Sequence, residues 1–170
     1  IEVLRGPQGT YYGAGSLGGT LRVLPKRPDL DEFSAEISGT ASSVDGADDL
    51  GTDVSGTVNL PIAAGKAALR GSLFQRDEAA YVDNLQTGQK VGGGTIEGGR
   101  IALLMEPTDN LDILLQAVTQ STVAEGRRAR EPFENAGNAQ RRRGDERDDS
   151  DLALYNANVG YDFGNVRLDS

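Results

Sequence analysis

Apolar and polar side chains alternate over most of the chain after residue 28, in several separate segments. In the stretch from Thr52 to Leu60, valine, glycine and leucine fill every second position, and Asp, Ser, Thr and Asn fill the positions between them. A period of two residues is typical of a β-strand with one apolar and one polar face. The pattern predicts six antiparallel strands of about ten residues each, at 33–43, 51–60, 66–77, 96–106, 111–121 and 151–162.

The connections between these segments alternate between long and short. Short connections are expected at 61–65, 107–110 and 163–165, and long ones at 44–50, 77–95 and 122–150. Transmembrane barrels have short turns at one end and long loops at the other, and a tilted strand of about ten residues crosses a bilayer. The alternative is a soluble secreted all-β protein that binds or adheres to a partner. A long loop without structure of its own is unusual in such a compact domain.

Charged and polar side chains lie between the apolar positions of the predicted strands. A barrel too wide to be filled by side chains can keep such groups on a wet inner face, whereas they would be costly in a closed soluble core. The residues concerned are Glu36, Asp53, Arg70, Arg100, Asp112 and Gln116.

Composition excludes several classes of protein. The chain has neither cysteine nor histidine, which excludes a disulfide scaffold, a thiol nucleophile, a histidine-based triad and the usual zinc sites. A net charge of −9 argues against a nucleic-acid partner. The longest apolar run, Ile101 to Met105, is far shorter than a membrane helix. Because no catalytic constellation is present either, we expect no enzyme activity and no cofactor.

Two groups of charged residues do not predict a binding site. Asp45, Asp48, Asp49 and Asp53 lack the fixed spacing of a Ca²⁺ loop, so we expect no metal. The last long connection carries equal numbers of basic and acidic residues, which is typical of a self-neutralising surface loop. Its arginines are Arg127, Arg128, Arg130, Arg141, Arg142, Arg143 and Arg147, and its acids are Glu125, Glu131, Glu134, Asp145, Glu146, Asp148 and Asp149.

The opening of the chain is rich in glycine and contains the spacing Gly13-x-Gly15-x-x-Gly18 of a dinucleotide-binding loop. That loop requires a strand directly before its first glycine and a helix beginning at its third. Here the preceding strand-like run ends at Leu4, and Pro25 stops the run that follows. The spacing therefore does not predict a nucleotide site.

The same opening, IEVLRGPQGTYYGAGSLGGTLRV followed by Lys-Arg-Pro, resembles the C-terminal part of the plug domain in TonB-dependent outer-membrane receptors. The matching positions include Ile1 to Leu4, Arg5, Gly6, Pro7, Gly9, Tyr12, Gly13, Gly18, Gly19 and Lys26 to Pro28. Tyr11 departs from the family, which more often has leucine there.

The resemblance implies an all-β membrane protein of the bacterial outer membrane. Residues 1–28 would be the last part of the plug, and residues 29–170 would form about six strands of a barrel of about 22. It implies active uptake of a scarce nutrient, such as an iron–siderophore, haem, cobalamin or a carbohydrate. The partners would be TonB with its inner-membrane energising complex, through a segment upstream, together with outer-membrane lipid and lipopolysaccharide.

The resemblance also assigns roles to individual residues. Arg5 would fasten the plug by pairing with barrel acids beyond residue 170. Packing and backbone turns, not ligand contact, are expected of Gly6, Pro7, Gly9, Tyr12, Gly13, Gly18 and Gly19. Six strands cannot close a barrel of this class, so the 170-residue polypeptide alone is expected to aggregate or to require detergent.

Overall fold

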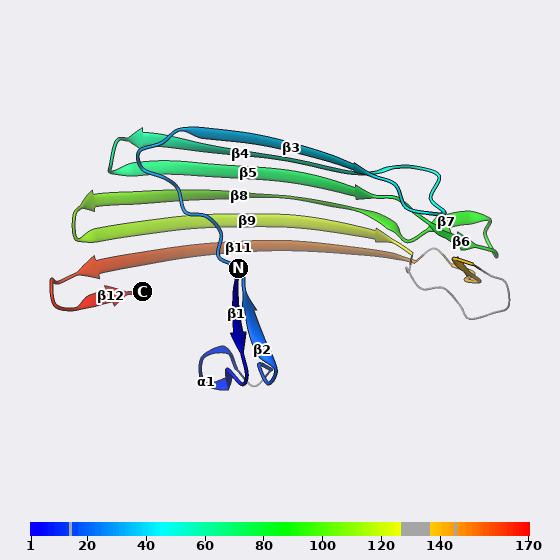
Figure 1. The fold of residues 1–170 in the computed structure, drawn as a ribbon, viewed down its shortest axis with the longest axis horizontal. Coiled ribbons are helices and arrows are strands. Elements are labelled where there is room, and N and C mark those ends of the chain that lie inside the picture. Colours follow the sequence, from blue (N-terminus) through cyan, green and yellow to red (C-terminus); the bar gives the residue numbers. More distant parts are fainter. Residues whose placement is uncertain (14, 127–136, 145) are drawn as a thin grey trace.

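The computed structural model describes residues 1–13, 15–126, 137–144 and 146–170, and these form an all-β fold with one short helical turn (Figure 1). The all-β prediction is confirmed. Within the described residues, no helix is long and apolar enough to cross a membrane. Six charged residues of the last connection lie outside the described part: Arg127, Arg128, Arg130, Glu131, Glu134 and Asp145.

Most of the chain forms one antiparallel sheet of seven strands in the order β12-β11-β9-β8-β5-β4-β3. Apart from the small additional strands, each strand pairs with the next one along the chain, so the sheet is a simple meander (Figure 1). Its strands are β3 Ser34–Ser42, β4 Gly51–Ala63, β5 Ala67–Glu78, β8 Gly93–Thr108, β9 Leu111–Glu125, β11 Arg147–Asp162 and β12 Arg167–Asp169.

All six alternating segments of the sequence lie in strands of this sheet, and several strands extend further than the alternation indicates. β4 continues to Ala63, β8 begins at Gly93, β9 reaches Glu125 and β11 begins at Arg147. The added residues are largely charged, polar or glycine, which a reading of hydrophobic pattern assigns to loops. Their backbone groups nevertheless pair across neighbouring strands.

The pairing register places the apolar positions of all six long strands on one face. Gly56, Leu73 and Gly99 lie opposite one another across β4, β5 and β8. On the same face, the next row toward the short turns contains Val58, Gly71 and Ile101. The next row toward the long connections contains Val54, Gln75 and Glu97. Four consecutive rows on this face are apolar. The first contains Met105 and Ile113, the last contains Leu73, and together they span roughly 20 Å along the strands. Leu73, Tyr155 and Ile37 are 72%, 79% and 87% exposed.

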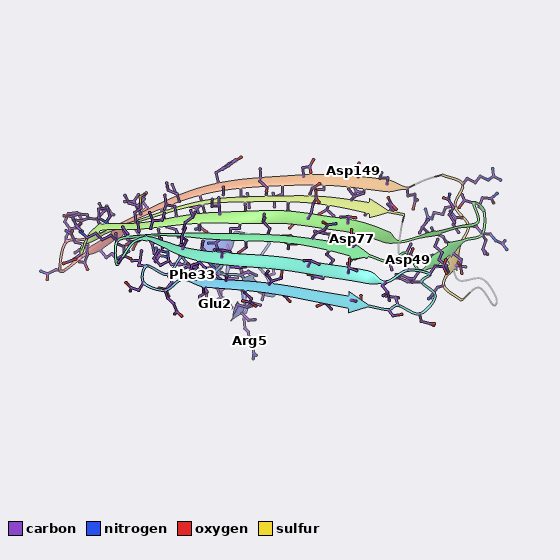
Figure 2. All side chains as sticks on the ribbon, turned by 90° about the horizontal axis from the view of Figure 1, so that it is seen from above. Glu2, Arg5, Phe33, Asp49, Asp77 and Asp149 are labelled. Atoms are coloured by element: carbon purple, nitrogen blue, oxygen red, sulfur yellow. The ribbon has the colours of Figure 1, made fainter. Side chains whose placement is uncertain are left out.

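The charged end of the sheet lies beside the long connections. In Figure 2, Asp49, Asp77 and Asp149 lie toward this end, and Phe33 lies nearer the end with the short turns. On the apolar face, the rows beyond Leu73 change to Gln75 with Glu97 and then to Asp77 with Thr95. The apolar face is therefore a band with a polar border at the long-loop end.

Two smaller sheets complete the fold. An N-terminal hairpin pairs β1 (Glu2–Arg5) with β2 (Gly19–Arg22), and α1 (Gly9–Tyr12) lies in the connection between them. This hairpin projects from the long strands (Figure 1). At the long-loop end, β6 (Val82–Asn84) lies between β7 (Gln89–Val91) and β10 (Ala139–Gln140).

Gly98 in β8 is required for close packing on the polar face. It lies directly opposite Phe74, and a Cβ at Gly98 would lie 2.9 Å from the Phe74 ring and 2.6 Å from the carbonyl oxygen of Thr119. We expect Gly98→Ala to destabilise the folded protein by about 1–3 kcal/mol, as overpacking does elsewhere. The measurement is the midpoint temperature of unfolding of each variant. Gly71→Ala is the matched control, because nothing lies within 4 Å of its Cβ, and equal midpoints for the two variants would contradict the prediction.

Candidate functional site

The polar face of the sheet carries the segment that joins the N-terminal hairpin to β3. The amide side chain of Asn59 on β4, which is completely buried, holds this segment. Its Oδ1 accepts a hydrogen bond from the Asp29 amide at 2.9 Å, and its Nδ2 donates to the carbonyl oxygens of Asp29 at 3.0 Å and Glu32 at 2.7 Å. One side chain thus fixes the path of four residues. We call residues 26–32 and their contacts on the sheet the linker anchor.

Asp29 shapes the turn within the linker anchor. Its carboxylate accepts hydrogen bonds from the amides of Asp31 at 3.0 Å and Glu32 at 3.1 Å. These two bonds lower the pKa of Asp29 below its ordinary value, because they favour the charged form. Their contribution to stability is present above the ordinary pKa of an aspartate and is lost as the pH falls through the lowered value.

Apolar packing supports the same segment. Leu30 packs against a buried cluster of Ala102, Leu104 and Leu114 on β8 and β9. The carbonyl oxygen of Leu30 accepts a hydrogen bond from the Gly65 amide in the short turn after β4. The linker anchor therefore has an apolar contact beside its hydrogen bonds to Asn59.

Asp112 on β9 joins the linker to the C-terminal end of the sheet. Its side chain, 16% exposed, pairs with Arg27 of the linker at 3.1 Å and also with Arg167 on β12. Gly160 lies beside this group, and a side chain there would displace Arg167 and Asp112. One carboxylate is thus shared by two guanidinium groups.

Arg100 makes a further contact with the linker. It donates to the carbonyl oxygen of Lys26 at 3.0 Å and to Oε1 of Gln116 at 2.6 Å. Farther toward the long-loop end, Asp53 pairs with Arg76 directly across from it. The register places the inner-face set predicted from sequence (Glu36, Asp53, Arg70, Arg100, Asp112 and Gln116) on this same polar face.

The glycine-rich opening is held by contacts of its own. Gly6 and Gly13 have positive φ angles of 85° and 82°, and a Cβ at Gly19 would lie 2.6 Å from the carbonyl oxygen of Leu4. These three glycines therefore meet a backbone requirement, whereas Gly9 and Gly18 have open space around them. Tyr12 is 43% exposed, and Pro7 lies in the connection between β1 and α1.

Arg5 is exposed at the end of β1, and its side chain points away from the long strands in Figure 2. Within the described residues it has no ion pair; the ion pair of this hairpin joins Arg22 to Glu2 at 3.2 Å. The role of Arg5 as a plug fastener stays a prediction, as do the structural roles of Gly6, Pro7, Gly9, Tyr12, Gly13, Gly18 and Gly19.

The long connections are tied together in a way that the sequence pattern did not predict. β10 pairs in parallel with β6, and Val82, Asn84, Ala139 and Gln140 are buried between the loops. Asn84 Nδ2 donates to the carbonyl oxygen of Arg142 at 3.0 Å. We call β6, β7, β10 and their loops the outer-loop cluster. Its strands of two or three residues are too short to produce an alternating pattern.

Lys90 connects the outer-loop cluster to the first long loop. Its ammonium donates to the carbonyl oxygen of Gly46 at 2.5 Å and to Asp83 at 3.1 Å, and it lies 3.7 Å from Asp48. The bond to Asp83 is the main cause that raises the pKa of Lys90. The tie is present below the ordinary value of 10.5 and is lost as the pH rises through the raised value, so it persists across the neutral range.

Replacing Lys90 is expected to loosen this cluster. Lys90→Met removes the donor to Gly46 and leaves Asp83 without its cation, so amide hydrogen exchange in 43–50 and 79–92 should be faster than in the wild type, while exchange in the long strands should not change. Gln89→Met is the control, because the Gln89 side chain is exposed. Equal exchange in the two variants would mean that Lys90 does not hold the loops together.

The fold defines a two-faced antiparallel β protein in which the linker, residues 26–32, is fixed to the polar face. Comparison with known proteins finds similarity to the pesticin receptors of Yersinia enterocolitica and Yersinia pestis, each 29% identical over 109 residues. The matched stretch is 64% of this chain and only 16% of each relative. No family model and no solved structure matches the chain. The relatives are receptors, which agrees with the expectation of a receptor in place of an enzyme.

Proposed function

We propose that the chain is part of a TonB-dependent outer-membrane receptor. Residues 1–28 would be the last part of its plug and residues 29–170 the first strands of its barrel. The observation that carries the proposal is the sheet with two unlike faces: an exposed apolar band on one face, and on the other a polar surface crossed by the linker. Lipid would cover the apolar band, and the polar face would line the lumen.

The direction of the chain in the membrane follows from the same proposal. The short turns would face the periplasm and the outer-loop cluster would face the outside, where lipopolysaccharide and the substrate are met. The linker anchor lies near the short-turn end, on the face assigned to the lumen. That position suits a connection between a plug inside a barrel and the first strand of its wall.

The proposed activity is uptake of a scarce nutrient, such as an iron–siderophore, driven through TonB and its inner-membrane complex. The similarity to pesticin receptors supports a receptor at the cell surface, and pesticin is a second ligand worth testing. The alternative of a soluble secreted binding protein is disfavoured, because a continuous apolar band of this size on a water-exposed sheet is an aggregation liability.

The test uses the full-length gene in bacteria with and without functional TonB. The protein should fractionate with the outer membrane, and uptake of radiolabelled iron supplied as ferric hydroxamate, catecholate or phenolate siderophores should fall to background without TonB, while surface binding persists. Labelled pesticin provides a separate binding measurement. Recovery in the soluble fraction without detergent would refute the proposal.

A further inference from the structure

We propose that the linker anchor remains attached to the barrel wall throughout transport, so that displacement of the plug begins on the N-terminal side of Lys26. This inference rests on the proposed function, since it assumes that residues 1–25 move. It makes Asn59 the positioning residue that divides the moving part of the chain from the fixed part.

The first argument is the complete pairing of Asn59. Its amide makes three hydrogen bonds to the linker backbone and is fully buried. Removing it would leave the amide of Asp29 and two carbonyl oxygens without their partner, and unsatisfied buried groups are costly. Pro28 is buried against the sheet as well.

The second argument is the number of different ties over a short distance. Lys26 is hydrogen-bonded to Arg100, and Arg27 forms an ion pair with Asp112. Asp29 and Glu32 are hydrogen-bonded to Asn59. Leu30 is hydrogen-bonded to Gly65 and packs on the cluster that contains Leu104. These ties reach β4, the turn that follows it, β8 and β9, so no single strand movement releases them. Hydrogen bonds, an ion pair and apolar contact all act together.

The third argument is the contrast with the preceding segment. In the described part of the chain, the hydrogen bonds and ion pairs of residues 1–25 join that segment to itself: Gln8 to Ser16, Tyr12 to Gln8, Arg22 to Glu2, and β1 to β2. Its strands contact each other and project from the long strands (Figure 1). The change from self-contained to wall-bound backbone occurs at Lys26.

Hydrogen exchange of the full-length receptor in detergent tests the anchor without any substrate. The amides of 29–32 should exchange at least about tenfold faster in Asn59→Ala than in the wild type. Thr57→Ala is the matched control: Thr57 lies two residues away on the same face of β4, and its hydroxyl bonds the Ser72 side chain on β5 and not the linker. Equal exchange in the two variants, or an unprotected linker in the wild type, would overturn the proposal.

A cross-link tests whether the anchor must open during transport. Leu30→Cys is combined with Leu104→Cys or Leu114→Cys in the full-length receptor and closed by oxidation or a short bis-maleimide. Uptake of radiolabelled iron, supplied as the ferric siderophore that the wild type accepts, should be unchanged by closure. Leu30→Cys alone with the same reagents is the control. Loss of uptake on closure, regained when a disulfide is reduced, would show that the linker leaves the wall.

The two proposals fail in different ways. If the wild type takes up none of the siderophores but Asn59→Ala alone exposes the linker, the proposed function is wrong and the anchor stands as a structural feature. If uptake depends on TonB but Asn59→Ala exchanges like Thr57→Ala, the function stands and the anchor is wrong.

Discussion

Leu73→Arg is expected to reduce assembly of the proposed receptor in the outer membrane. Leu73 lies near the polar border of the apolar band, between Gly56 and Gly99, and is largely exposed. In a barrel this position faces lipid at the edge of the hydrocarbon layer, where the cost of an arginine lies between about 0–1 kcal/mol at the interface and about 2–4 kcal/mol at the midplane. The measurement is the amount of folded protein in the outer membrane, judged by resistance of the folded form to unfolding in detergent.

The matched control for this variant is Ser55→Arg. Ser55 adjoins Gly56, the cross-strand partner of Leu73, but lies on the polar face opposite Phe74. An arginine there would enter a wet lumen beside other charged groups, so assembly should remain near the wild-type level. Equal assembly of both variants would contradict the assignment of the two faces, and a soluble Leu73→Arg protein would contradict the membrane location.

The strands could be predicted from sequence because period-two alternation is a local property. Leu69, Gly71 and Leu73 alternate with Arg70 and Ser72, and the pleat of a strand is sufficient to separate them onto two faces. The pairing of β4 with β5 and of β8 with β9 also followed, because a short connection leaves a strand no other neighbour. The N-terminal ends of β8 and β11 could not be predicted from the alternation, since the glycine and acidic residues there join the sheet through their backbone groups.

The contacts of the linker anchor could not be predicted from the alternation of apolar and polar residues. Asn59 reads as one more polar position in an alternating strand, and Asp29 and Pro28 read as the end of a motif. Their contact joins residues 30 apart in the chain and depends on the path of the linker across four strands. Only the fold specifies that path. The sequence offers one signal for this contact: an asparagine, which bonds backbone groups well, at an inner-face position near a short turn.

The two ion pairs of the Asp112 carboxylate likewise could not be predicted from sequence. The sequence placed Asp112 on the inner face, but neither of its partners follows from spacing: Arg27 comes from the linker and Arg167 from β12. Gly160 is needed because it leaves room for the guanidinium of Arg167. A charge judged from sequence as lining a lumen is thus also a tie between the linker and β12.

The 170-residue polypeptide, produced alone, is expected to aggregate in buffer and to disperse only in detergent. Two features cause this. In the described part of the chain, β3 pairs only with β4, and β12 pairs only with β11, so each leaves one row of backbone groups open. The apolar band adds exposed side chains such as Ile37 and Tyr155. The measurement is the sedimented fraction with and without detergent.

A variant separates the contributions of the open edge and the apolar band. Ile37→Lys places a charge on β3, both at the open edge and within the apolar band, whereas Ser38→Lys places a new charge at the same edge but on the polar face. If edge pairing dominates, both lysines should reduce sedimentation in buffer, because charged edge strands resist pairing. If the apolar band dominates, only Ile37→Lys should do so. A monodisperse wild-type polypeptide in buffer would contradict both accounts, because it would mean that the sheet covers its apolar face without lipid and without the remaining strands of a barrel.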